Sequence, residues 1–306
     1  MNPDLDIKLD RIARPNRVMA PIRYFGGKGI IAPRILPYLP DGRIYVEPFC
    51  GAASLFWHQR PHPVEVLNDL DGEVINLFRV LQDEDLFLKF RHKVIWTPYS
   101  LDEFRRAIAY RGDDPLMWAW AMYVAHNQGF GGIIGETEGA WGRAFVSSRG
   151  MAYTASIWRG RMRSLDSFHD RLTRVQLDNR DALQVIRYWD SPETVFYLDP
   201  PYTSGSRMNK AVYRHEMTDE QHRALVEVLL RIEGSAMLSG YADAIYEPLN
   251  EAGWDRIEIE TVCHAAGKVR GSGLQGADSA LKKVPRTEVL WIKKNANQQQ
   301  KGLFTS

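Results

Sequence analysis

An acid, two prolines and an aromatic ring stand together as Asp199-Pro200-Pro201-Tyr202, directly after the apolar residues 195–198. The apolar residues predict a buried strand, and the prolines predict a rigid turn because each fixes its own backbone and lacks an N–H donor. Such a turn leaves carbonyl oxygens unpaired beside one carboxylate and one flat ring. These groups suit chemistry on the amino group of a nucleobase. The alternative is a plain strand end, with Tyr202 as packing.

A second group of candidate residues lies where two more predicted strands end. Residues 45–54 predict a strand, a tight turn of small residues and a helix that begins near Ser54. Ligands of open α/β sheets bind at such turns, but one glycine is too few for the dinucleotide fingerprint, which argues against NAD. The next strand ends in Asn68-Asp69, where an acid suits the hydroxyls of a ribose. Asp71 is predicted to cap the following helix.

Upstream, residues 24–29 carry three glycines and Lys28 before a predicted helix. The spacing and the Ser/Thr of a Walker phosphate loop are missing, which argues against a kinase or an ATPase. Backbone N–H groups at a helix start, together with a cation, suit a carboxylate instead. A ligand with a ribose, a purine and an amino-acid carboxylate is S-adenosylmethionine.

The elements that must position these groups alternate between strand and helix. The first block predicts strands at 44–46 and 64–67 and helices at 30–38, from 54, and at 71–81. The second block predicts a strand at 195–198, a helix at 219–232 with a capping box of Thr218 and Gln221, and strands at 236–238, 257–259 and 289–292. This alternation is typical of an α/β fold whose mostly parallel sheet is covered on both faces.

Residues 97–172 break this rhythm and predict a mainly helical insertion, with a helix at 115–126 and a glycine-rich loop or hairpin at 127–135. Arginines crowd its second half, where only Asp166 and Asp170 oppose them: Arg143, Arg149, Arg159, Arg161, Arg163, Arg171 and Arg174. A second basic cluster follows: Lys268, Arg270, Lys282, Lys283 and Arg286. Such clusters commonly meet phosphates, and a solvated surface is the alternative.

The composition is that of a globular protein, with 306 residues, 44% hydrophobic and 25% charged, and a net charge of +1. No apolar stretch approaches the roughly 20 residues that span a bilayer, and residues 1–17 lack a signal-peptide core. Cys50 and Cys263 are too few for a disulfide framework and have no metal-ligand spacing. We expect a cytoplasmic protein without membrane contact or metal.

Taken in order, residues 24–28, 47–54, 68–69 and 199–202 resemble the motifs of the D12-class N6-adenine DNA methyltransferases, which include the Dam enzymes. The resemblance implies a Rossmann-like class I sheet with helices on both faces, which binds S-adenosylmethionine and carries a mainly helical inserted target-recognition domain. The implied catalytic domain spans 20–96 and 173–295, and the insertion spans 97–172. Residues 1–19 are then a flexible arm and residues 296–306 a flexible tail.

The resemblance also implies roles for single residues. Asp199, Pro200 and Tyr202 are the implied catalytic residues, which hold and stack on an adenine that is rotated out of the duplex. The implied cofactor-binding residues are Tyr24, Gly26, Gly27, Lys28, Glu47, Phe49, Gly51, Ala52, Asp69, Asp181, Ala182 and Asp199. S-adenosylhomocysteine is the implied product. Asp181 also suits a helix cap.

Double-stranded DNA is the implied partner. The resemblance implies DNA contacts for Phe130 and Arg143. The two basic clusters add Arg149, Arg159, Lys268 and Arg270 to the expected DNA-contacting residues. Phe130 aligns with an aromatic ring that fills the hole left by the flipped base, and it also suits the core of a hairpin. Where GATC-reading enzymes carry an asparagine and an arginine, residues 131–136 read Gly-Gly-Ile-Ile-Gly-Glu, so the arginine that reads guanine is missing. We therefore expect a target other than GATC, or relaxed specificity.

Two other functions stay open from the sequence: a methyltransferase that acts on RNA or a protein amide, and a DNA-binding protein with a decayed site. The aspartate at position 199 and the arginine-rich insertion favour adenine in DNA. We expect a monomer or a weak dimer from a bacterial, phage or prophage setting.

Overall fold

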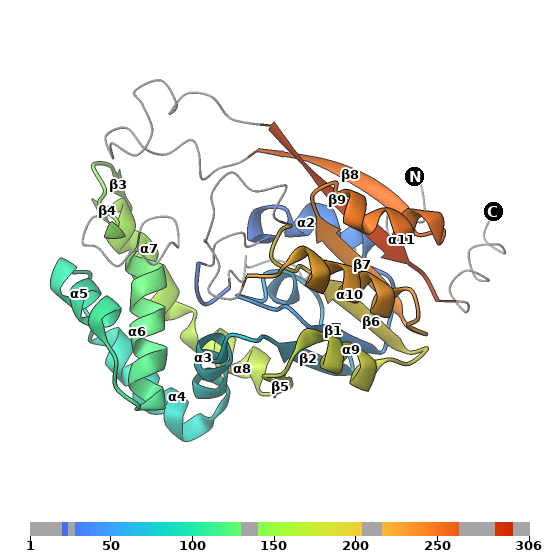
Figure 1. The fold of residues 1–306 in the computed structure, drawn as a ribbon. Coiled ribbons are helices and arrows are strands. Elements are labelled where there is room, and N and C mark those ends of the chain that lie inside the picture. Colours follow the sequence, from blue (N-terminus) through green and yellow to red (C-terminus); the bar gives the residue numbers. More distant parts are fainter. Residues whose placement is uncertain (1–19, 24–27, 130–139, 204–215, 263–284, 296–306) are drawn as a thin grey trace, which may run out of the picture.

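The computed structural model describes residues 20–23, 28–129, 140–203, 216–262 and 285–295. Seven strands within these residues form a central sheet (Figure 1). Their order across the sheet is β5 (Gln176–Asp178), β2 (Val64–Asn68), β1 (Ile44–Glu47), β6 (Thr194–Leu198), β7 (Ser235–Gly240), β9 (Pro285–Lys293) and β8 (Asp255–Val262). The first five strands are parallel, and β9 runs antiparallel to both of its neighbours. The predicted α/β class with a mostly parallel sheet is confirmed.

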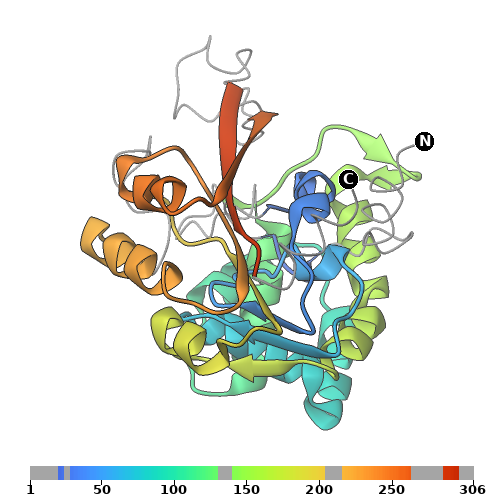
Figure 2. The ribbon, with the colours of Figure 1, turned by 90° about the vertical axis from the view of Figure 1, so that its right-hand side faces the viewer.

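The central strands are mostly apolar and almost fully buried because helices cover both faces of the sheet. In β6, Tyr197 enters one core and its neighbour Phe196 enters the other. The first core is shared with α2 (Ala32–Ile35), α3 (Gly72–Gln82), α4 (Glu84–Ile95), α5 (Leu101–Ala109), α6 (Pro115–Gln128), α7 (Tyr153–Arg163) and α8 (Leu165–Leu172). The second is shared with α9 (Ala182–Trp189), α10 (Asp219–Leu229), η6 (Ala244–Tyr246) and α11 (Glu247–Glu251). Figures 1 and 2 show these two layers.

The register of the sheet brings three strand ends together. In β1, Glu47 pairs with Leu67 of β2, and Val46 pairs with Phe196 of β6. Because all three strands are parallel, the segments that follow them leave the sheet at one edge. Residues 48–55, 69–71 and 199–203 therefore meet there, although they are far apart in the sequence.

Two predicted helices near this edge are wrong. A single helix at 30–38 does not form, because Pro33 and Pro37 each begin a new short turn. The segment is divided among η1 (Lys28–Ile30), α2 and η2 (Leu36–Tyr38). After Ser54 the chain forms only η3 (Phe56–His58), since the preceding Gly51 and Ala53 have φ of 46° and 53° and cannot continue a helix.

The helices of residues 97–172 pack on α3 and α4 without a gap in the core. Phe90 of α4 meets Tyr123 of α6 edge-on, with ring centroids 5.5 Å apart, and Tyr123 lies 5.8 Å from Trp158 of α7. Between α6 and α7, β3 (Ser147–Ser148) and β4 (Met151–Ala152) form a small hairpin. The domain boundaries at 97 and 172 stay predictions. None of the described helices has the length and apolar character of a membrane span.

Candidate functional site

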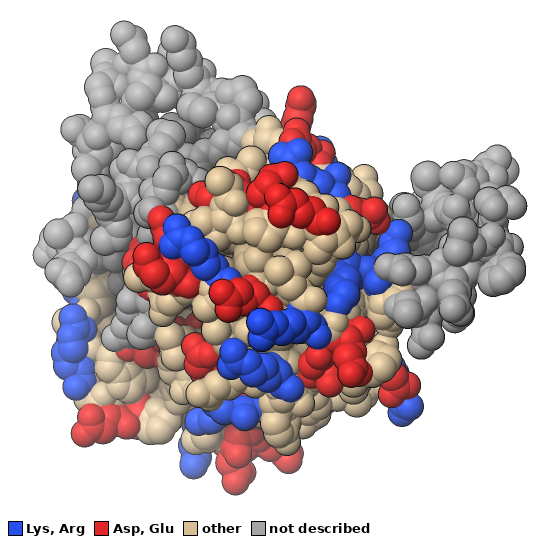
Figure 3. Space-filling model, turned by 45° about the vertical axis from the view of Figure 1, so that its right-hand side comes forward, with Lys and Arg blue, Asp and Glu red and all other residues tan. Residues whose placement is uncertain are grey.

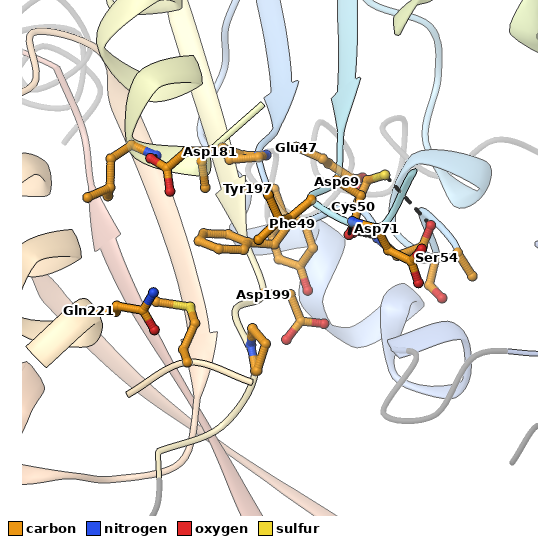
Figure 4. Close-up of a pocket in the computed structure, with 18 of the residues that line it drawn as sticks. Glu47, Phe49, Cys50, Ser54, Asp69, Asp71, Asp181, Tyr197, Asp199 and Gln221 are labelled. Atoms are coloured by element: carbon orange, nitrogen blue, oxygen red, sulfur yellow. Dashed lines mark hydrogen bonds between the residues drawn. The ribbon is translucent and has the colours of Figure 1, made fainter. Parts of the chain in front are cut away.

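A pocket opens at the carboxyl ends of β1, β2 and β6 (Figure 4). It is lined by every described residue that was predicted to bind the cofactor: Lys28, Glu47, Phe49, Gly51, Ala52, Asp69, Asp181, Ala182 and Asp199. Tyr24, Gly26 and Gly27, also predicted there, lie outside the described residues. In Figure 4, Asp69 and Asp181 lie on opposite sides, with Phe49 and Asp199 between them.

Glu47 ends β1 and fixes the turn that follows. Its side chain is buried, and its Oε1 accepts hydrogen bonds from the Tyr45 hydroxyl at 2.5 Å and the Phe56 N–H at 3.0 Å. Burial raises the pKa of Glu47 to about 8, and the hydrogen bonds offset only part of this rise. The carboxyl group is therefore mostly protonated at neutral pH, and it holds the wall of the pocket in place as a neutral acceptor.

Asp69 closes the turn after β1 from the neighbouring strand. Its Oδ2 accepts the Gly51 N–H at 2.7 Å, and its Oδ1 accepts the Asp71 N–H at 2.9 Å. A carboxylate oxygen accepts more than one hydrogen bond, so both oxygens can also receive hydroxyl groups of a ligand. The predicted capping role of Asp71 is confirmed, because its side chain accepts the Glu73 N–H in the first turn of α3.

Asp181 caps a helix and also lines the pocket. Its Oδ1 caps α9 by accepting the N–H groups of Leu183 and Gln184 at 3.0 Å and 3.3 Å. The same side chain lines the pocket next to Ala182. The roles are compatible because both capping bonds end on one oxygen.

Asp199 follows β6 and is held by a buried lysine. The Nζ of Lys28 lies 2.6 Å from Asp199 Oδ1 and 2.9 Å from the hydroxyl of Tyr202. Ser239 of β7 donates to the same Asp199 oxygen at 3.2 Å. Among the described residues, both hydrogen bonds to Asp199 end on Oδ1, and this leaves Oδ2 to accept from a ligand.

Glu288 of β9 completes this network. Its Oε1 lies 3.3 Å from Lys28 Nζ, and both side chains are buried. Burial alone would lower the pKa of Lys28, but attraction to Asp199 and Glu288 outweighs burial and raises that pKa well above its ordinary value. Burial raises the pKa of Glu288 to about 7 in spite of the lysine. Lys28 therefore stays charged, and two carboxyl groups share its charge.

The two remaining predicted catalytic residues, Pro200 and Tyr202, do not line the pocket. Pro201 lines the pocket, whereas Pro200 is buried and Tyr202 does not belong to the lining. The ring of Tyr202 stacks on Tyr241, with centroids 4.3 Å apart and planes 21° from parallel. Lys28 and Tyr241 thus fix both the hydroxyl and the ring of Tyr202.

The predicted DNA-contacting residues do not gather at this pocket. Arg143, Arg149 and Arg159 are exposed and lie outside its lining. Phe130, Lys268 and Arg270 fall outside the described residues. In the part of the chain that the structure describes, no three His, Cys, Asp or Glu side chains are grouped so that they could hold a metal ion.

Sequence reasoning missed Glu288, Ser239 and Tyr241. Glu288 stands directly before the apolar residues 289–292, and an acid at the edge of a buried strand is the one signal that could have marked it. The other two offer no signal, because their roles depend on β7 pairing with β6.

A mostly parallel sheet with a pocket of carboxylates at its carboxyl edge is typical of α/β proteins that bind nucleotides. The model of the D12 class N6 adenine-specific DNA methyltransferases matches residues 24–106 and 138–253, which is more than half of the chain. The chain belongs to this family. The match omits residues 107–137, which include the glycine-rich segment with an unusual sequence.

A relative with a known name is the DNA N-6-adenine-methyltransferase of Escherichia phage P1. It is 34% identical to this chain over 62 residues, which make up 20% of this chain and 8% of the phage protein. The likeness therefore concerns one short segment of a much longer protein.

Proposed function

We propose that this protein transfers a methyl group from S-adenosylmethionine to N6 of an adenine that is rotated out of double-stranded DNA. The observation that carries the proposal is the pocket itself, in which Asp199 faces the same space as Asp69 and Asp181. Membership of the family supports the reaction. The strand order, with an antiparallel last strand between β7 and β8, supports a Rossmann-like class I fold.

The side chains of the pocket fit S-adenosylmethionine. Asp69 would accept the ribose hydroxyls, and Asp181 would accept the amino group of the cofactor's adenine through the oxygen that does not cap α9. Phe49, Leu183 and Met217 supply apolar wall for the purine. When bound, the cofactor supplies an electrophilic methyl group on a sulfonium.

The carboxylate of Asp199 would orient the target amine. Lys28 and Ser239 hold Oδ1, so Oδ2 would accept a hydrogen bond from the adenine N6–H, and the Pro200 carbonyl would accept the second. These bonds favour a pyramidal nitrogen, which helps the transition state more than the ground state. Asp199 need not be a strong base, because methylation itself makes the nitrogen acidic.

The role of Lys28 changes from the one the sequence suggested. The ammonium group was expected to suit a carboxylate of the cofactor, but Asp199, Glu288 and Tyr202 already surround it. We assign it to positioning Asp199 and Tyr202. A flipped adenine would then stack against a Tyr202 ring that Tyr241 supports from behind.

The helices of residues 97–172 would form the target-recognition part, inserted between two parts of the catalytic domain at 20–96 and 173–295. Exposed arginines there would meet the phosphates of duplex DNA. No arginine occupies residues 131–136, and this supports a target other than GATC or relaxed specificity.

Methyl transfer from labelled S-adenosylmethionine to duplex DNA, RNA or protein tests the proposal. We expect label in N6-methyladenine of duplex DNA. Asp199→Ala should fold and bind the cofactor but lose transfer by a factor on the order of 10² or more, since it loses an oriented acceptor. Asp85→Ala, an exposed aspartate of α4, serves as the control and should keep full activity.

Three results would contradict the proposal. Label in RNA or protein alone would show that DNA is not the substrate. Binding of duplex DNA without uptake of the cofactor would favour a decayed site. Wild-type turnover in Asp199→Ala would remove that residue from the reaction.

A further inference from the structure

The arginines of residues 140–165 have no acidic partner within their own segment. This stretch holds five arginines and neither an aspartate nor a glutamate. The face of the molecule in Figure 3 is different, because basic and acidic side chains are interspersed over it. A local excess of positive charge attracts anions from outside the protein.

Arg161 is the unusual member of this group because it is buried. It lies in the last turn of α7 and is 5% exposed, and its guanidinium group donates to the carbonyl of Ala20. Its Nε is buried without a hydrogen-bond partner, and no carboxylate among the described residues forms an ion pair with it.

The surroundings of Arg161 make its charge costly. Burial lowers the pKa of Arg161 to about 10, and the nearby Arg23 contributes in the same direction, while Tyr123 opposes both. The group still carries its charge at neutral pH. A buried charge without a counter-ion is costly, and no carboxylate in the part of the chain that the structure describes offsets the charge of Arg161.

A second pocket lies beside Arg161. It is lined by Ser148, Arg149, Tyr153, Ser156, Ile157, Gly160, Arg161, Ser164 and Phe168. Arg149 and Gly150 form the tip of the β3–β4 hairpin, and both have positive φ, at 55° and 75°. A non-glycine residue with such φ is uncommon, and here it carries a guanidinium group to the pocket. A Cβ atom built on Gly160 would meet nothing within 4 Å, so this wall has room for a small side chain.

We propose that this second pocket binds a backbone phosphate of the DNA substrate. Two guanidinium groups, from Arg149 and Arg161, and the hydroxyls of Ser148 and Ser156 supply donors of the kind that hold phosphate oxygens. The hydroxyl of Ser164 already donates to the Gly160 carbonyl at 3.2 Å. The inference rests on the proposed function, and it adds a phosphate site away from the chemistry. In Figures 1 and 2 the β3–β4 hairpin lies at the same end of the molecule as the tips of β8 and β9, so one duplex laid over this end could reach both.

The first experiment measures the affinity of the full chain for a short DNA duplex at several salt concentrations. For Arg161→Gln, log K should fall less steeply with log salt, by about 0.9, because one phosphate contact is lost. Affinity at low salt should fall roughly 10-fold. Arg187→Gln is the matched control, since it removes one exposed arginine from α9 on the other face of the sheet. It should leave the slope unchanged.

A stability measurement separates this role from a structural one. Removing an unpaired buried charge should leave the thermal midpoint of the DNA-free protein unchanged or raise it. A large fall in that midpoint, together with an unchanged salt slope, would make Arg161 a structural residue and overturn the proposal.

A second pair of variants tests the pocket while keeping Arg161. Gly160→Glu places a negative charge on the wall of the same pocket and should lower DNA affinity at least as much as Arg161→Gln. Gly160→Ala lengthens the side chain by one carbon and should keep affinity close to wild type. Wild-type affinity in Gly160→Glu would overturn the proposal.

Further arms identify the anion and keep the two proposals apart. Inorganic phosphate could stabilise wild type but not Arg161→Gln while the two proteins show the same salt slope for DNA binding. In that case the pocket binds free phosphate and the DNA assignment is wrong. The DNA assignment would also be wrong if Arg161→Gln changed the salt slope for single-stranded RNA but not for duplex DNA. If wild type transfers no methyl group while Arg161→Gln still changes the slope on duplex DNA, the proposed reaction fails and the phosphate site stands.

Discussion

Replacing Glu47 by glutamine should make the stability of the protein less sensitive to pH between 4.5 and about 8. The carboxyl group is buried, and burial raises its pKa from 4.5 to about 8. The folded state therefore binds the proton more tightly than the unfolded state. This contribution to stability is complete below pH 4.5 and is lost as pH rises through 8.

The size of this pH effect follows from the interval between the pKa of Glu47 in the unfolded state and its pKa in the folded state. Each pH unit between 4.5 and about 8 lowers the free energy of unfolding by about 1.4 kcal/mol, so the whole interval lowers it by roughly 5 kcal/mol. Glutamine keeps the carbonyl oxygen that accepts from Tyr45 and Phe56 but has no proton to lose. Its new buried N–H groups cost about 1–3 kcal/mol at any pH.

Urea unfolding at pH 5.5, 7 and 8.5 measures this difference. Between pH 5.5 and 8.5 the free energy of unfolding of Glu47→Gln should gain roughly 3 kcal/mol relative to wild type. The matched control is Glu65→Gln, because Glu65 is also buried but has a bidentate partner in Arg171, at 2.5 and 2.6 Å. Breaking that ion pair should cost about 3–5 kcal/mol. A difference between Glu47→Gln and wild type that does not change with pH would refute the reasoning.

Three further substitutions have defined outcomes. Lys28→Met should lower the free energy of unfolding by about 3–5 kcal/mol, because it leaves the buried Glu288 and the partly buried Asp199 without a cation. Adding Glu288→Gln should restore part of this loss in a double-mutant cycle, and additive effects would contradict the network. On the proposed function, Tyr241→Ala should lower kcat by about 1 kcal/mol of stacking that supports Tyr202, and it should leave the KM for S-adenosylmethionine nearly unchanged. A rise in KM with kcat unchanged would argue against this role. Gly253→Ala should cost about 1 kcal/mol in chemical unfolding because φ is 82° there, and unchanged stability would contradict that conformation.

The sheet was predictable from the sequence because its strands are short apolar runs that both cores bury. Strands at 44–46, 64–67, 195–198, 236–238, 257–259 and 289–292 all lie within observed strands. The edge strand β5 was missed, since its three residues are too few to show a pattern. The capping box of Thr218 and Gln221 was found, because it depends only on neighbours in the chain.

Contacts between distant segments could not be predicted in this way. The residues that line the pocket follow strand ends, so the parallel sheet brings them together by rule. The partners of Lys28 are different, because Asp199 and Glu288 meet it only after three separate parts of the chain pack. The helix expected from Ser54 does not form for the same reason. Hydrogen bonds from Gly51 to Asp69 and from Phe56 to Glu47 fix this segment, and the local sequence does not indicate them.

The position of β9 has a consequence for biosynthesis. This strand comes last in the described chain, yet it inserts between β7 and β8 and brings Glu288 to Lys28. While a ribosome is still making it, β8 has no neighbour and β7 offers an open edge, the kind of surface that recruits other strands. A polypeptide that stops before residue 285 lacks β9, so the edge of β7 stays uncovered and Lys28 lacks Glu288. Premature termination should therefore yield aggregates and no partly active enzyme.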